Sequence, residues 1–352
     1  MQRYLLSSIL LIGMLACVAS ETAQADEQLP RRERPTWRLE LANDLIFSSD
    51  NQFTNGFTIQ KHSTTSGDFD DLQGVRAFGK RLARKLLPQG NDLVYRKALI
   101  VGQIMGTPDA IEETEIILDD APYLGMLAAE SSWIAFNDTE LTGFATTIGI
   151  VGEYSFAEQA QSGIHSIIDA TEPNGWDNQL DNEPVLNFHY MKKRKLWNRP
   201  SFDGAFEFDL SVGNFFTGLD VGIETRFGRK PGGFSFVPDP LGRAMAYDAT
   251  LPRQDGRTEV YGTLAARAWT WAVFMPFEGN TFASGNEWTD NNTVDPEKVI
   301  GQVIAGFHVV RPSWGIHFTW TFATDNVDQN SIRPGVEVEN DFGTLMFEWR
   351  FR

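Results

Sequence analysis

The chain has 352 residues, a formal net charge of −17 at pH 7 and one cysteine. The negative charge disfavours nucleic acid as a partner, because phosphate backbones attract basic surfaces. No segment after residue 25 approaches the roughly 18 consecutive apolar residues of a transmembrane helix. The absence of such a segment leaves a soluble exported protein or an outer-membrane β-barrel, and the aromatic content of 12% and the 31 glycines favour the barrel.

Residues 1–25 have the pattern of a secretory signal peptide. Arg3 supplies a positive start, residues 5–19 form a short apolar core, and Ala23-Gln24-Ala25 is a small-x-small cleavage site. Cys17 lies inside this segment, so a chain cleaved after Ala25 has no cysteine for a disulfide. The polar residues 26–36 predict a periplasmic lead-in.

Period-two alternation begins at Trp37 and recurs to the end of the chain. Large apolar residues on one face of each segment suit lipid, and polar or small residues on the other suit a lumen. We therefore predict an all-β fold, a transmembrane antiparallel β-barrel of about 12 strands over residues 37–352. A soluble β-sandwich is the alternative. The segments are 37–43, 54–62, 98–105, 123–136, 146–154, 184–196, 205–213, 219–227, 260–271, 299–309, 314–322 and 345–351.

Two stretches interrupt the alternation. Residues 63–97 contain a basic segment at 79–89, which predicts a solvated connector helix. Residues 155–170 predict a short external helix after the fifth strand. If the first strand starts in the periplasm, strand counting places residues 43, 44 and 54 and this helix at the same outward rim.

The predicted helix 155–170 carries Gln161 and His165 four residues apart, and therefore on one helical face. Histidine titrates near neutral pH, which suits a general base. A histidine on a helix is more often structural than catalytic, so the spacing alone does not assign the chemistry. The other four histidines lie in strand patterns and are interpreted as polar lumen residues.

Asn43 and Asp44 end the first predicted strand, and Thr54 begins the second. Asx residues favour turns, and local sequence alone supports that interpretation. The functional alternative is a hard-cation site, in which carboxylate and amide oxygens favour calcium or magnesium over zinc. The Thr54 hydroxyl would position substrate. No Gly-x-Ser-x-Gly or His-Glu-x-x-His motif is present, which disfavours an α/β-hydrolase and a zincin.

Taken together, these stretches resemble the outer-membrane lipid A 3′-O-deacylase family. The resemblance covers nearly the whole chain after the signal peptide. The residues that carry it are Ala42-Asn43-Asp44, Phe53-Thr54-Asn55-Gly56, Gln161, His165, Ile168, Pro173-Asn174-Gly175-Trp176, Gln179-Leu180 and Asn182-Glu183-Pro184.

The resemblance implies a twelve-stranded barrel with a calcium-dependent esterase site at its outer rim. By this resemblance, His165 is the general base that activates water, Asp44 and Asn43 belong to the cation site, and Thr54 and Gln161 complete the polar pocket. The implied substrate is the 3′-linked acyloxyacyl chain of lipid A, the lipid anchor of lipopolysaccharide, presented from the outer leaflet.

The loop after the third strand departs from the family pattern. It carries Asp109, Glu112, Glu113 and Glu115 and has no basic residue, whereas characterised members have one there. Three alternatives therefore stay open: the lipid A deacylase, another outer-membrane lipid esterase such as a phospholipase, and a non-catalytic pore or scaffold barrel.

Overall fold

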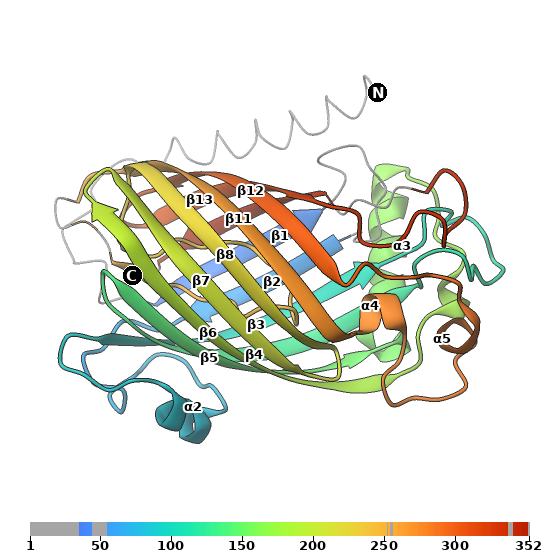
Figure 1. The fold of residues 1–352 in the computed structure, drawn as a ribbon, viewed down its shortest axis with the longest axis horizontal. Coiled ribbons are helices and arrows are strands. Elements are labelled where there is room, and N and C mark those ends of the chain that lie inside the picture. Colours follow the sequence, from blue (N-terminus) through green and yellow to red (C-terminus); the bar gives the residue numbers. More distant parts are fainter. Residues whose placement is uncertain (1–34, 44–54, 252, 254–255, 337–340, 351–352) are drawn as a thin grey trace.

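The computed structural model describes residues 35–43, 55–251, 253, 256–336 and 341–350. The predicted signal peptide, most of the lead-in, Asp44 and Thr54 lie outside these residues. In the described part of the chain, twelve strands pair in the order β1-β14-β13-β12-β11-β8-β7-β6-β5-β4-β3-β2 and close a barrel (Figure 1). The predicted fold class is confirmed.

The strands and helices have the following bounds. The barrel strands are β1 (Thr36–Asn43), β2 (Asn55–His62), β3 (Val94–Gly106), β4 (Leu124–Phe136), β5 (Glu140–Val151), β6 (Glu183–Arg199), β7 (Phe202–Gly213), β8 (Phe216–Arg229), β11 (Glu259–Phe274), β12 (Val299–Val310), β13 (Trp314–Ala323) and β14 (Phe342–Trp349). A small separate sheet contains β9 (Gly232–Gly233) and β10 (Thr250–Leu251). The helices are α2 (Lys80–Leu86), α3 (Ala157–Ile168), α4 (Met275–Glu278) and α5 (Glu287–Asn291), with 3-10 turns η3 (Glu153–Ser155) and η4 (Trp176–Asn178). Of the helices described, none has the length and apolarity to cross a membrane.

The barrel wall has the two faces that the alternation predicts. Arg38 and Glu348 face the lumen and are buried, whereas Phe57 and Ile59 on β2 are 39% and 43% exposed on the outer face. An exposed apolar outer surface is what lipid requires. β1 pairs with β14, so the wall closes on itself and the soluble sandwich is excluded.

The boundaries around the fifth strand differ from the prediction. β5 ends at Val151, because Gly152 takes a φ of 94° and its N–H donates to Gly125 O at 3.0 Å. The chain then turns through η3 before α3 begins. α3 is shorter than 155–170, since Phe156 and Asp169 at its two ends have left-handed φ values of 60° and 57°.

Residues 230–251 form a lumen segment that the strand pattern does not reveal. The segment follows β8, folds into the barrel interior and leads on to β11. The Ala246 N–H donates to the inward-facing Glu130 at 2.8 Å, and Arg38 Nη1 donates to Tyr247 O at 3.0 Å. Because the segment bonds to inward side chains on two different strands of the wall, β4 and β1, it fills space that an open pore would need.

The connector helix predicted in residues 79–89 is present as α2, but it is not simply solvated. Ala83 and Leu87 are buried against Trp133 and Phe144 of the barrel wall. The sequence does not show this covered face, because the wall residues that bury it lie more than 40 positions away in the sequence.

Candidate functional site

The strand order defines one outer rim. β1, β3 and β5 end there, and β2, β4 and β6 begin there. The connections 107–123 and 152–182 at this rim are long, whereas three connections at the opposite end, 137–139, 200–201 and 311–313, are short turns. In bacterial outer-membrane barrels long loops are extracellular and short turns periplasmic. Figure 1 shows α3, α4 and α5 at this rim and α2 towards the other end.

α3 packs against the outside of the barrel wall at the rim. Gln103 on β3 faces outward, and its Nε2 donates to Ser155 O at 2.6 Å. Ala157, the first residue of α3, is buried with Met105, Tyr123 and Trp176. The helix therefore lies on the face of the β3–β4 wall that meets lipid.

Asn43 belongs to the same outer surface. It follows the outward-facing Trp37, Leu39 and Leu41 at two-residue intervals on β1 and is half-buried. Asn43 pairs with residue 55 of β2, which pairs with Met105 of β3. Two strand spacings amount to about 10 Å, so the end of β1 lies close to the wall residues that hold α3.

His165 has a defined tautomer. Its Nδ1 lies 2.5 Å from Thr171 O. A carbonyl oxygen can only accept, so in the neutral ring Nδ1 carries the hydrogen and Nε2 carries the lone pair. The ring is half-exposed, and no residue in the described part of the chain bonds Nε2. This is the state in which an imidazole can take a proton from water.

The other four histidines are buried polar residues of the lumen, as interpreted from the sequence. Each has a hydrogen-bond partner on a neighbouring lumen side chain, which explains its burial. The contacts are His62 with Gln60 at 3.0 Å, His189 with Ser211 at 2.7 Å, and His308 with His317 at 2.9 Å.

Gln161 holds the loop that follows α3. Its side chain is buried, and Oε1 accepts a hydrogen bond from Trp176 Nε1 at 2.8 Å. Its Nε2 is also buried and has no acceptor among the residues that the structure describes. Trp176 and Leu180 are buried, and Asn182 Oδ1 accepts from Tyr154 N at 2.8 Å. The residues of the 173–184 motif therefore build the frame that fixes α3.

A basic residue from another loop, Arg333, forms ion pairs with the acidic loop 107–123. Arg333 donates to Asp119 at 3.0 Å and to Glu113 at 3.1 Å. Sequence reasoning missed Arg333, and no local motif signals it. In the same loop, burial raises the pKa of the Asp120 carboxyl to about 6, although it accepts from Asp109 N at 2.9 Å.

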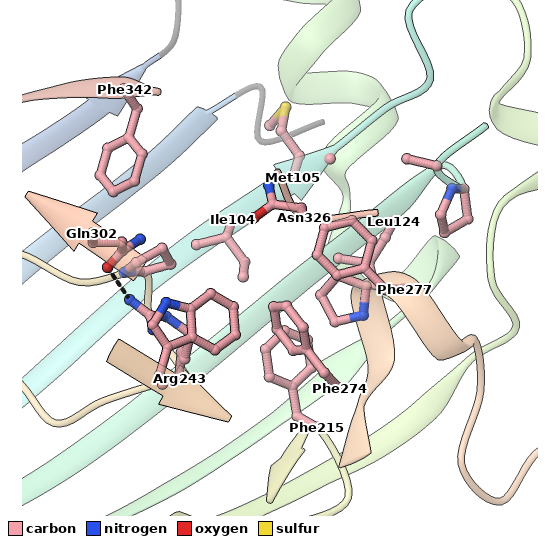
Figure 2. Close-up of a pocket in the computed structure, with 16 residues that line it drawn as sticks. Ile104, Met105, Leu124, Phe215, Arg243, Phe274, Phe277, Gln302, Asn326 and Phe342 are labelled. Atoms are coloured by element: carbon pink, nitrogen blue, oxygen red, sulfur yellow. Dashed lines mark hydrogen bonds between the residues drawn. The ribbon is translucent and has the colours of Figure 1, made fainter. Parts of the chain in front are cut away.

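An apolar pocket lies in the mouth of the barrel, on the lumen side of the wall (Figure 2). It contains no residue that can act as a general base. Its polar lining is Arg243, Gln302 and Asn326, and Arg243 donates to Gln302 at 3.3 Å. The other lining residues are Ile104, Met105, Gly106, Ala121, Pro122, Leu124, Phe215, Pro240, Trp269, Phe274, Pro276, Phe277 and Phe342. We therefore place the candidate chemistry at α3, outside the wall.

We expect Gly125→Ala to lower activity about 100-fold by displacing α3, because misplacing a catalytic group by about 1 Å has a cost of this order. A Cβ at Gly125 would overlap Ala157 Cβ and Ser155 Oγ; the hydroxyl can rotate away, but Ala157 Cβ cannot move without the backbone of α3. The matched control is Gly163→Ala on α3 itself, where a Cβ meets nothing within 4 Å. Hydrolysis rates of the two folded variants check the prediction, and equal rates would contradict it.

The family comparison covers nearly the whole chain. The sequence profile of the family described as "Outer membrane protein LpxR" matches residues 6–351. LpxR from Salmonella typhimurium aligns with a TM-score of 0.69 at 14% identity, over 90% of this chain and 100% of that chain. At this identity the likeness shows a common fold.

Other solved structures align less closely. The β domain of the Bordetella autotransporter BrkA has a TM-score of 0.40 at 8% identity, over 90% of this chain and 98% of that chain. A search of curated proteins finds no match. The profile match across residues 6–351 shows that this chain belongs to the LpxR family of outer-membrane proteins.

Proposed function

We propose that this protein removes the 3′-linked acyloxyacyl chain from lipid A in the outer leaflet, using water that His165 activates. The observation that carries the proposal is the imidazole itself. Its Nδ1 is fixed by Thr171 O, and its Nε2 is available on a helix outside the barrel wall. The family resemblance supplies the substrate class.

The position of α3 suits a substrate that stays in the membrane. The helix packs on outward-facing wall residues at the outer rim, and Tyr154 and Phe156 beside it are 61% and 59% exposed. Apolar rings on this surface can contact acyl chains directly. An ester bond near the lipid–water boundary then reaches His165 without leaving the leaflet.

The resemblance implies a calcium ion, and the oxygen-bearing side chains of Asn43 and Asp44 fit it by type. Asn43 offers an amide oxygen at the end of β1 and Asp44 a carboxylate, which is the oxygen chemistry that calcium prefers. When bound, the cation would supply positive charge that stabilises the negative oxygen formed on the ester carbonyl. No group of three His, Cys, Asp or Glu side chains suited to a metal occurs within the described residues.

The remaining residues would bind and orient the ester. Gln161 Nε2 is a buried donor without an acceptor among the described residues, and an ester oxygen would satisfy it. Thr54 would contribute a hydroxyl from the start of β2. His165 would take the proton of the attacking water at Nε2 and return it to the leaving oxygen.

A second candidate is hydrolysis of another outer-leaflet lipid ester. The acidic loop favours it, because Asp119 and Glu113 already bind Arg333, which leaves that guanidinium less able to bind a lipid A phosphate. The lumen segment occupies the barrel interior, and this argues against the third alternative, an open pore.

Mass spectrometry of lipids from cells that express the full chain tests the proposal. We expect lipid A to lose one acyloxyacyl mass and the phospholipids to remain unchanged. Loss of acyl chains from phospholipids alone would support the second candidate. If neither lipid class changes while the protein is present in the outer membrane, the proposed hydrolase activity is wrong.

A further inference from the structure

A second element covers the outside of the barrel, towards the end opposite α3. Ser131, Trp133 and Phe144 have the outward orientation of lipid-facing residues, yet they are 0%, 1% and 2% exposed. Ser131 Oγ and Trp133 Nε1 both donate to Phe78 O, at 2.7 and 2.9 Å. Residues 66–93, here called the wall segment, therefore lie against the outer wall of β4 and β5.

The wall segment is anchored by its own apolar core. Its buried residues pack on the aromatic side chains of the wall, and Phe69 lies 5.5 Å from Trp133 between ring centroids. Lys97 Nζ on β3 also donates to Leu72 O at 3.0 Å. The core residues of the segment are Phe69, Leu72, Ala83 and Leu87. Because of these contacts, α2 is held beside the wall (Figure 1).

The wall segment lies at the boundary of the lipid-facing band. On β5, Phe144 is covered by the segment, whereas Ile148 is 45% exposed on the same outward face. These two residues are about 13 Å apart along the strand. Val101 on β3 is likewise 46% exposed. On β5, the segment therefore begins where the exposed apolar surface ends, towards the periplasmic end of the strand.

The outer face of α2 is basic and partly apolar. Residues 76–86, RAFGKRLARKL, contain five basic residues and no acidic one, in a chain of net charge −17. Asp70 pairs with Lys80 and Arg84, but Arg81 and Lys85 form no ion pair within the described part of the chain. Leu82 and Leu86 beside them are each 40% exposed.

We propose that α2 binds the phosphate headgroups of anionic phospholipids in the periplasmic leaflet. Interfacial helices combine basic residues with exposed leucines in this way, so that the leucines enter the headgroup boundary and the cations meet phosphate. Each basic residue near an anionic membrane surface contributes about 1 kcal/mol. The placement of α2 at the membrane boundary selects lipid over an acidic protein as the partner.

Lipid binding by the purified full chain tests this proposal. The protein in uncharged maltoside detergent is titrated with dihexanoyl phosphatidylglycerol or dihexanoyl phosphatidylcholine, and native mass spectrometry counts the bound lipids. We expect the wild type to prefer phosphatidylglycerol. Arg81→Gln with Lys85→Gln should weaken its binding roughly 30-fold, the factor that corresponds to two charges of about 1 kcal/mol each.

Two variants serve as controls. Arg81→Lys with Lys85→Arg keeps both charges and should retain the preference. Lys298→Gln removes one positive charge at the outer rim, where Lys298 pairs with Glu278, and should also leave binding unchanged. All variants are checked for heat-modifiable gel mobility, which reports a folded barrel.

A salt titration of the wild type gives a test that depends on no variant. Raising the ionic strength shortens the Debye length from about 30 Å at 0.01 M to about 3 Å at 1 M. Binding of phosphatidylglycerol should weaken and binding of phosphatidylcholine should not. Equal binding of both lipids by the wild type, or no loss in the Gln double variant, would overturn the proposal. Neither result depends on the hydrolase activity.

Discussion

His165→Ala should lower the rate of lipid A deacylation by about 10²–10⁴-fold, the range that a positioned general base supplies. The imidazole Nε2 can accept a proton from water, because Nδ1 already donates to Thr171 O. The side chain is half-exposed and outside the barrel core, so the variant should fold. Single-turnover assays with purified lipopolysaccharide, read by mass spectrometry, measure the loss.

Two further substitutions separate base chemistry from positioning. His165→Asn places an amide N–H at the position of Nδ1 and can still donate to Thr171 O but cannot take a proton, so it should be as inactive as the alanine variant. Ser166→Ala, at the next and exposed position of α3, should keep the wild-type rate. A His165→Asn variant with the wild-type rate would show that the imidazole only positions the helix.

The barrel could be predicted because alternation is a local property. Each strand residue faces lipid or lumen according to the parity of its position, so Val299 and Val303 on β12 appear outward in the sequence and are 64% and 48% exposed in the structure. Counting the strands then predicted that Asn43 and α3 lie at the same rim. Parity and counting need no knowledge of which side chains touch.

The lumen segment and the wall segment could not be predicted in the same way. Phe234, Met245 and Tyr247 pack with wall residues such as Leu141 and Met191, which precede them by more than 40 positions. Arg333 reaches Asp119 across 214 positions. Such contacts depend on closure of the barrel, which local pattern does not encode.

The structure tests the predicted role of some site residues and not of others. The sequence singled out Gln161 as a polar partner of His165, whereas the structure shows its Oε1 accepting from Trp176. A residue spacing of four places both side chains on one helical face, but it does not show that Trp176 folds back from the following loop. The proposed roles of Asp44 and Thr54 remain predictions, because both lie outside the described residues.

Asp248→Ala should lower the free energy of unfolding by about 3–5 kcal/mol, the cost of breaking a buried ion pair. Asp248 lies in the lumen segment and pairs with two buried arginines of the wall, Arg38 at 3.3 Å and Arg96. Arg38 keeps Glu348 as a partner, at 3.2 Å. The variant should therefore leave Arg96 as the uncompensated buried charge. Denaturant unfolding in detergent, followed by loss of heat-modifiable mobility, measures the change.

Asp70→Ala is the matched control for this prediction. Asp70 also pairs with two basic residues, Lys80 and Arg84, but its side chain is 45% exposed. Exposed pairs contribute about 0–1 kcal/mol, so its removal should have a small effect. Equal losses for the two variants would contradict the view that buried ion pairs fix the lumen segment. A larger loss for Asp248→Ala, together with new ion conductance in planar bilayers, would show that these pairs hold the lumen segment where it blocks the barrel interior.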